Sequence, residues 1–318
     1  MQPVLKMRNS FFQNPKSIAM KIISINRIII VVSIFLSTTF LFSCQKESSL
    51  NNSDATVTEE QAATYSDESA QADASFDDVT DVSMTAADED NTASIGRTDR
   101  FYHPDFAELR AAIGLCATIS VEPNDSTYPK TITIDFGDSC VGADGKLRSG
   151  KIVLHLTGPI RHPGSVLTIT FVNFYLNHVH LEGTKIISNL SENNTIKFTV
   201  QVVGGKVTFR SGRGYSYESF KYKKQIAGMD TRIVRDDVFE ITGWAKIKYN
   251  NGVVVKFETI DPLIKKVACP WISDGTLKIQ INDRVLKLDY GFPNNGDCDN
   301  KALLTWNNGN SQRVILLP

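Results

Sequence analysis

The sequence lacks the short motifs that mark several common classes of enzyme. It has no Gly-x-Ser-x-Gly nucleophile motif, and no glycine-rich phosphate loop leads into a helix. No two of its cysteines are close in sequence, which excludes a Cys-x-x-Cys redox or zinc motif. These absences argue against a serine hydrolase, a phosphate-loop nucleotide enzyme and a thiol oxidoreductase.

Acidic residues are absent from residues 1–44, which contain five basic residues. An almost unbroken apolar run from Ile28 to Phe42 follows these charges, and it is shorter than the roughly 20 residues that span a bilayer. This order predicts a secretory signal peptide over residues 1–43, with Met20 as an alternative start. A permanent membrane helix is the alternative, but no basic stop-transfer cluster follows the run.

The apolar run ends at Cys44, and the residues before it resemble the lipobox read by lipoprotein signal peptidase. Leu41 lies three positions before the cysteine and Ser43 directly before it, although Phe42 is larger than the residue usual between them. The resemblance implies that Cys44 becomes the lipidated N-terminus of the mature chain. Two or three acyl chains, at about 0.8 kcal/mol per buried methylene, hold a protein stably on a membrane. An incidental cysteine after an ordinary signal is the alternative.

Basic residues are scarce in the next segment. Residues 45–100 contain 14 acidic and three basic residues, many small polar residues and no apolar periodicity. This composition predicts disorder, so residues 44–100 are interpreted as the lipidated cysteine and a disordered acidic tether. Such a tether has a root-mean-square reach of about 40 Å. The alternative is an acidic recognition segment that binds cations or a basic partner.

Long helical segments are lacking after residue 100. One short helix is predicted within residues 103–114, with Pro104 in its first turn and Gly114 at its C-terminal cap. Alternating apolar residues then predict strands. They lie at residues 130–136, 151–157, 167–171, 196–202, 253–257, 277–281 and 286–290. Frequent turn signals between them indicate an all-β domain over residues 101–318, an antiparallel meander forming a sandwich or a partly closed barrel.

Four cysteines remain when Cys44 is set aside, and an even number in an exported chain predicts disulfides. They are Cys116, Cys140, Cys269 and Cys298. Each successive pair encloses a hairpin whose second strand ends in an Asp, an aromatic residue and a Gly, with Asp135 and Asp289 as the acids. This similarity suggests two pseudo-repeated units, with chance resemblance as the alternative. Equivalent units predict the pairs Cys116–Cys140 and Cys269–Cys298.

Several stretches resemble a known group of proteins. With the signal, the lipobox and the acidic segment, the sequences YPKTITIDFG, LEGTK, ITGWA and DYGFPNNGDCDNKALLTW are similar to the uncharacterised outer-membrane lipoproteins of Bacteroidota. The resemblance covers most of residues 115–318 and implies a lipid-anchored location at the outer membrane, without an activity. In that group an acidic cluster behind the lipidated cysteine directs export to the cell surface. Only Glu47 is near Cys44, so surface and periplasmic orientations both stay open.

The best candidate ligand surface is the stretch from Lys206 to Lys224, in which basic and aromatic residues alternate. Its candidate ligand-binding residues are Arg210, Arg213, Tyr215, Tyr217 and Tyr222. Aromatic faces stack on sugars, and basic groups favour anionic glycans or lipopolysaccharide headgroups. The alternative is a hairpin whose aromatic residues are half core and whose lysines protect an edge strand.

Other polar residues give weaker signals. His178 and His180 could ligate zinc with a third histidine, but surface histidines are the simpler interpretation, and no metal or cofactor is predicted. The mildly basic charge of residues 101–318 is too small to indicate nucleic acid. We therefore expect a non-catalytic, lipid-anchored envelope protein that binds a glycan or an envelope protein. A polysaccharide or peptidoglycan hydrolase using Asp135 and Asp289 is the alternative.

Overall fold

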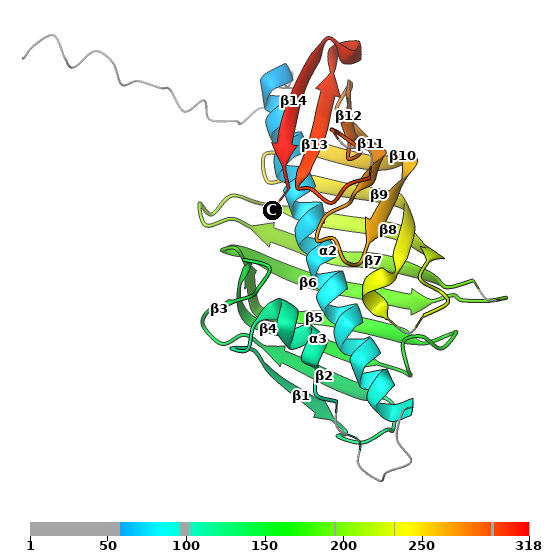
Figure 1. The fold of residues 1–318 in the computed structure, drawn as a ribbon. Helices are drawn as coiled ribbons and strands as arrows, with labels where there is room; N and C mark the ends of the chain where they lie inside the picture. Colours follow the sequence, from blue (N-terminus) through cyan, green and yellow to red (C-terminus); the bar gives the residue numbers. More distant parts are fainter. Residues whose placement is uncertain are drawn as a thin grey trace, which may run out of the picture. The chain divides into compact units, whose positions relative to one another are not determined.

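A single antiparallel sheet of 14 strands makes up most of the computed structural model (Figure 1). The structure describes residues 58–95, 102, 104–193, 195–231, 233–293 and 296–317, so the predicted signal peptide and Cys44 lie outside the described residues. The strands are β1 (Thr118–Glu122), β2 (Lys130–Asp135), β3 (Cys140–Val141), β4 (Leu147–Leu156), β5 (Val166–Leu176), β6 (Val179–Asn189), β7 (Lys197–Thr208), β8 (Gly214–Ala227), β9 (Val238–Tyr249), β10 (Val254–Lys266), β11 (Asp274–Ile281), β12 (Arg284–Asp289), β13 (Lys301–Trp306) and β14 (Ser311–Leu316).

Strands that follow each other in sequence are neighbours in the sheet. The order runs from β1 through β2 and β4 to β14 without a crossover, and the short β3 pairs with β4 beside this path. The sheet has β1 and β14 as its two ends and does not close into a barrel. The all-β antiparallel meander is thus confirmed as one open, curved sheet. All seven strands predicted from alternation are present, as parts of β2, β4, β5, β7, β10, β11 and β12.

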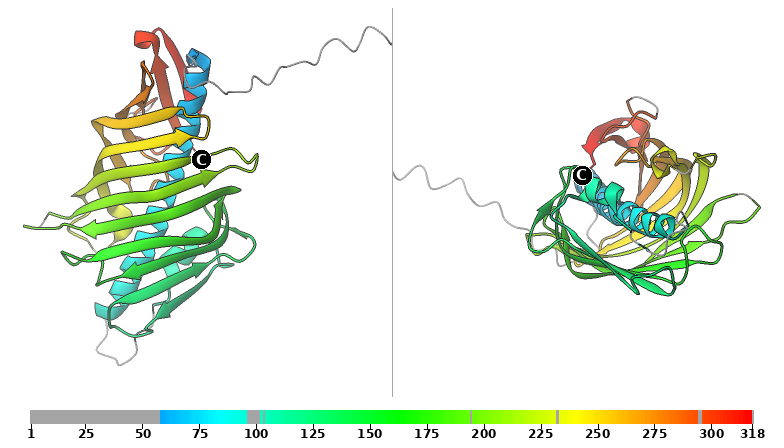
Figure 2. Two further views of the ribbon diagram at one scale, coloured as in Figure 1. Left: turned by 180° about the vertical axis from the view of Figure 1, so that it is seen from behind. Right: turned by 60° about the horizontal axis from the view of Figure 1, so that its bottom comes forward.

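A 37-residue helix, α2 (Glu59–Ile95), forms where the composition predicts a disordered tether. It runs across the concave face of the curved sheet (Figure 2). Many of its side chains are buried there, including Phe76 and Val79. The prediction of disorder is therefore wrong for Glu59–Ile95, and this segment belongs to the folded unit with the sheet. No helix in the described part of the chain is sufficiently long and apolar to cross a bilayer.

The reason for this difference is that α2 contacts the sheet through charged as well as apolar side chains, and its own composition does not reveal their partners. Its large buried apolar side chains are few, and most other buried positions hold Ala, Ser, Thr or Asp. Eight of its acidic side chains pair with basic side chains from the rest of the fold. The pairs are Asp67–Arg313, Glu68–Arg213, Asp73–Lys221, Asp77–Lys221, Asp78–Lys146, Asp78–Arg148, Asp81–Lys265, Asp88–Arg161 and Asp90–Lys130. The acidic segment therefore has a basic partner, which is the chain's own sheet.

Breaks in strand register help to curve the sheet around α2. Each strand pair from β4–β5 to β7–β8 contains such a break, with the extra residues in β5 and β7, and another break lies between β9 and β10. Bulges of this kind bend a strand and increase its twist. Gly150 in β4 has a φ of 77°, and a Cβ atom there would lie 2.0 Å from the carbonyl oxygen of Asn173 in β5. Only glycine permits this close approach of the two strands.

The predicted short helix and both predicted disulfides are present. The helix α3 (Ala107–Ile113) buries Leu109 and Ile113. The bonded pairs are Cys116–Cys140 and Cys269–Cys298. The two hairpins end in the same kind of turn. The carboxylate of Asp135 accepts a hydrogen bond from the N–H of Gly137, and that of Asp289 accepts one from the N–H of Gly291, at 2.9 Å in both cases. The similarity of the two units is thus local, because both belong to one continuous sheet.

Candidate functional site

The predicted ligand stretch is divided between the two faces of the sheet. Side chains alternate along β8, so Tyr215, Tyr217 and Lys221 face α2 and are buried, whereas Tyr222 lies on the opposite, outer face and is 54% exposed. Arg213 pairs with Glu68 of α2. The predicted residues therefore do not form one binding surface, because a strand presents alternate residues to opposite sides.

Tyr215 and Tyr217 belong to the packing between α2 and the sheet. The ring of Tyr217 stacks on Phe76 of α2 with centroids 4.5 Å apart, and its hydroxyl donates a hydrogen bond to Asp73. Tyr215 packs against Tyr249, with ring centroids 5.0 Å apart. Burial raises the pKa of Tyr217 well above its ordinary value, so the hydroxyl stays protonated as a donor. These tyrosines stabilise the fold and are not available to a ligand while α2 is in place.

A buried charge cluster lies beside Tyr217. The Lys221 ammonium is 2.9 Å from a carboxylate oxygen of Asp73 and 3.0 Å from one of Asp77. Burial alone would lower the pKa of Lys221, but the two carboxylates outweigh it and raise that pKa. Burial would likewise raise the pKa of Asp77, whereas Lys221 and the nearby Lys185 lower it below the ordinary value. Lys221 and Asp77 therefore stay ionised, and the cluster is an internal contact between α2 and β8.

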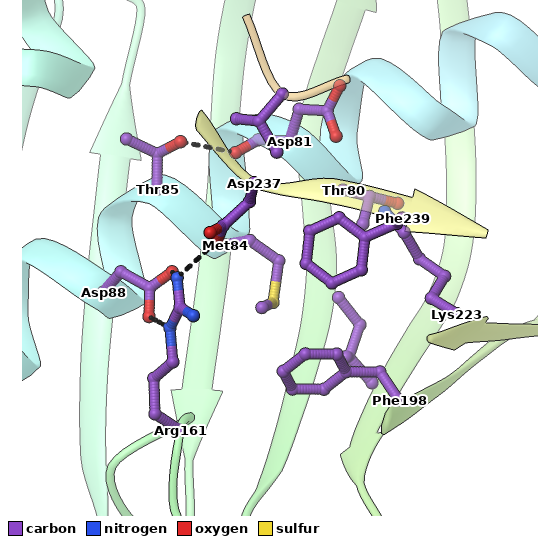
Figure 3. Close-up of a pocket in the computed structure, with 12 residues that line it drawn as sticks. Thr80, Asp81, Met84, Thr85, Asp88, Arg161, Phe198, Lys223, Asp237 and Phe239 are labelled. Carbon is purple, nitrogen blue, oxygen red and sulfur yellow. Dashed lines mark hydrogen bonds and ion pairs between the residues drawn. The ribbon is translucent and has the colours of Figure 1, made fainter. Parts of the chain in front are cut away.

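A small cavity separates α2 from β6–β9 (Figure 3). Phe198, Phe239 and Met84 line it, and Arg161 pairs at its edge with Asp88, at 2.8 Å, and with Asp237, at 3.0 Å. The volume of this cavity is about 30 Å³, sufficient for about two water molecules. The concave face is thus almost filled by α2 and has no room here for a larger ligand.

A larger hollow than this cavity lies on the outer face of the sheet, at the ends of β4–β7. We call it the outer groove, and its volume by the same measure is about 610 Å³. It is lined by Asp138, Ser139, Leu147, Ser149, Tyr175, His178, His180, Thr208, Phe209 and Arg210. The strand register places four side chains in a row across the floor of the groove. They are consecutive cross-strand partners on four neighbouring strands, namely Ser149, Tyr175, His180 and Thr208.

The outer groove combines aromatic and polar side chains. The rings of Tyr175 and His180 stack with centroids 4.5 Å apart, and Phe209 adds a third ring from the β7–β8 turn. Arg210 is exposed and makes no ion pair with another residue of the described chain, and Asp138 supplies one carboxylate. No cluster of three metal-binding side chains occurs within the described residues. The groove can therefore offer ring contacts, hydroxyl groups and one charge of each sign.

The structure does not bring Asp135 and Asp289 together. They lie at the ends of β2 and β12, with eight strands between them in the sheet order. Each caps its own turn, and Asp135 also pairs with Lys151 at 2.6 Å. Hydrogen bonds from Lys151 and Gly137 lower the pKa of Asp135, which is opposite to the raised pKa of a general acid. These two acids therefore do not form the facing pair that a glycosidase requires.

Sequence reasoning found part of the outer groove but not the groove itself. It identified Arg210 as a ligand residue and His178 and His180 as a separate pair, whereas the structure places all three on one surface. It missed Tyr175 and Phe209, which lie in strands and turns that carry no recognisable motif. Comparison with protein-family models, curated proteins and solved structures found no match to this chain. The candidate site therefore depends on its own geometry and chemistry.

Proposed function

We propose that this chain is a non-catalytic protein of the cell envelope, anchored in the outer membrane by lipid on Cys44, and that it binds a glycan in the outer groove. The observation that carries the binding function is the groove itself, with the stacked Tyr175 and His180 on its floor and Arg210 at its side. Binding sites for small ligands are typically concave and combine ring surfaces with a few polar groups.

The chemistry of the outer groove favours an uncharged sugar over a polyanion. Ring faces contact the apolar face of a pyranose, and the hydroxyls of Ser139, Ser149 and Thr208 suit its hydroxyl groups. Two of the basic groups that suggested an anionic ligand already have acidic partners on α2: the buried Lys221 pairs with Asp73, and the exposed Arg213 pairs with Glu68. One arginine and one carboxylate remain in the groove, so its charges are balanced.

The envelope location has independent support from the chain. Two disulfides join all four cysteines after Cys44, as expected for a protein that folds in an oxidising compartment. The signal and lipobox patterns before Cys44 provide the export route and the anchor. Lipid at Cys44 anchors the protein to a membrane.

A binding screen with neutral oligosaccharides tests the proposed function. Tyr175→Ala and Arg210→Ala should each weaken binding about tenfold, which corresponds to about 1.4 kcal/mol. Matched controls are Tyr222→Ala, an exposed tyrosine outside the groove, and Arg235→Ala, an exposed arginine on another loop. Both controls should bind as the parent chain does.

The same samples are analysed for sugar products by chromatography. Equal affinities of the groove variants and the controls would refute the groove as the binding site. Release of shortened oligosaccharides by the parent chain would refute the non-catalytic function. Circular dichroism of each variant confirms that the fold is retained before affinities are compared.

A further inference from the structure

The beginning of α2 lies at the β12–β14 end of the sheet. The guanidinium of Arg313 in β14 donates a hydrogen bond to the carbonyl oxygen of Ala63, at 3.1 Å. Ala62 lines the same surface pocket as Val285 and Trp306. The chain therefore enters the folded unit beside β12–β14, as Figure 1 shows for the blue end of α2 next to the red strand β14.

The length of chain before α2 limits how far this end can lie from a lipid on Cys44. Thr58 follows Cys44 by 14 residues. A segment of that length spans at most about 50 Å, even when fully extended. Strands lie about 4.8 Å apart, so the path across the sheet from β14 to β1 is about 60 Å. A lipid at Cys44 therefore keeps the β12–β14 end within about 50 Å of the bilayer and places no such limit on the β1 end.

The outward face of β12–β14 carries apolar and basic side chains, together with one carboxylate, that of Asp289, which accepts a hydrogen bond from Gly291. Val314 and Leu316 are 44% and 59% exposed, and their cross-strand partners are Leu303 and Lys301. Lys287 lies opposite Thr305 on the neighbouring pair of strands. Apolar side chains flanked by lysines suit the boundary between acyl chains and anionic headgroups, because the lysine stems lie along apolar surface while the ammonium groups reach phosphate.

We infer that the outward face of β12–β14 lies on the surface of the phospholipid bilayer, with Val314 and Leu316 at the acyl boundary and Lys287 and Lys301 on lipid phosphates. This inference rests on the proposed lipid anchor at Cys44. The outer groove on β4–β7 is six to nine strands from β13 in the sheet order, or about 30 to 45 Å along the sheet. The bilayer contact therefore holds the groove away from the membrane, where a glycan can enter it.

A quenching experiment tests the contact directly. The chain from Cys44 onward has one free thiol, because its other cysteines form disulfides. That thiol is coupled to a maleimide phospholipid in vesicles of phosphatidylcholine and phosphatidylglycerol, which fixes the chain at the proposed position. Leu316→Trp is compared with Val141→Trp, because Val141 is a similarly exposed residue in β3, 60% against 59%. Quenching by brominated phospholipids is measured as the difference from the parent chain, which has three tryptophans.

We expect at least twofold stronger quenching of Leu316→Trp than of Val141→Trp. Equal quenching, or stronger quenching of Val141→Trp, overturns the contact. Val314→Trp provides the same readout if Leu316→Trp unfolds at a lower urea concentration than the parent chain. Charge reversal of Lys287 and Lys301 to Glu should reduce the quenching of Leu316→Trp in phosphatidylglycerol vesicles.

Native lipidation is measured separately, so that failure of the anchor can be distinguished from failure of the contact alone. Cells that express the full chain are fed a labelled fatty acid, with Cys44→Ser as the control. Absence of label on the parent chain overturns the anchor, and the membrane contact with it. Label on the parent chain together with unquenched Leu316→Trp overturns the contact alone.

Discussion

Replacing Tyr217 with alanine distinguishes a ligand-binding tyrosine from a core tyrosine. The side chain is fully buried, its ring stacks on Phe76 and its hydroxyl donates to Asp73. If Tyr217 instead faced a ligand, its loss would weaken binding and leave the free energy of unfolding almost unchanged. The structure predicts the reverse, because the ring joins α2 to β8.

The expected cost follows from what alanine removes. Truncation of a buried aromatic side chain to alanine costs about 3–5 kcal/mol through lost apolar contact and the remaining cavity. A hydrogen bond to a charged group contributes about 1.5–3 kcal/mol, but Asp73 keeps Lys221 as a partner, so this loss is at the lower end. We expect Tyr217→Ala to lower the free energy of unfolding by about 4 kcal/mol or more and Tyr217→Phe by about 1.5 kcal/mol.

Urea unfolding followed by tryptophan fluorescence and circular dichroism measures these changes. Tyr222→Ala is the matched control, since Tyr222 lies on the outer face of the same strand and should change stability by no more than about 0.5 kcal/mol. A cost below about 1 kcal/mol for Tyr217→Ala would refute the packing of α2 on β8, because no buried aromatic contact is so small.

Two further predictions concern buried charges. Asp90→Ala leaves the buried Lys130 without its carboxylate and should cost about 3–5 kcal/mol in urea unfolding. The double variant Asp90→Leu with Lys130→Met should recover only part of that loss, because the hydroxyls of Tyr102 and Tyr128 also donate to Asp90; an equally unstable double variant would contradict this. Burial lowers the pKa of Lys185 to about 7, whereas its ordinary pKa is 10.5. Between these two pH values the unfolded chain binds more protons than the folded chain does. The free energy of unfolding should therefore rise with pH in this range, by up to about 1.4 kcal/mol per pH unit. Lys185→Met should flatten this rise between pH 7 and 9.5, and an unchanged slope would contradict the assignment.

The strands of the sheet can be predicted from sequence where apolar and polar residues alternate without interruption. In β2, β11 and β12, buried apolar residues recur at every second position, and these strands were found. In β6 the buried Lys185 interrupts the apolar alternation. In β7 one extra residue opposite Glu182–Thr184 moves the buried positions from Val200 and Val202 to Val207. Period two fails as a signal at a bulge, since one extra residue exchanges the faces of all residues beyond it.

The candidate site is harder to predict, because residues that are adjacent in a strand lie on opposite faces of the sheet. The stretch from Arg210 to Tyr222 looked like one basic and aromatic surface, yet Tyr217 faces α2 and Tyr222 faces outward. The outer groove instead gathers residues from four strands and their turns, including Tyr175. Its members are adjacent through strand register, which alternation alone does not specify between strands.

The charge asymmetry of the sequence acquires a structural explanation. Residues 45–100 carry a net charge of −11 and residues 101–318 carry +5, and the structure shows much of this difference as ion pairs between α2 and the sheet. Disorder was predicted because the acidic segment was judged by its own composition. Buried ion pairs contribute little net stability. A long polar helix without a wide apolar stripe, however, could shift by one turn along an apolar surface. The physical role of the ion pairs here is to set the register of α2, because a shift by one turn would leave several buried carboxylates and ammonium groups unpaired at once.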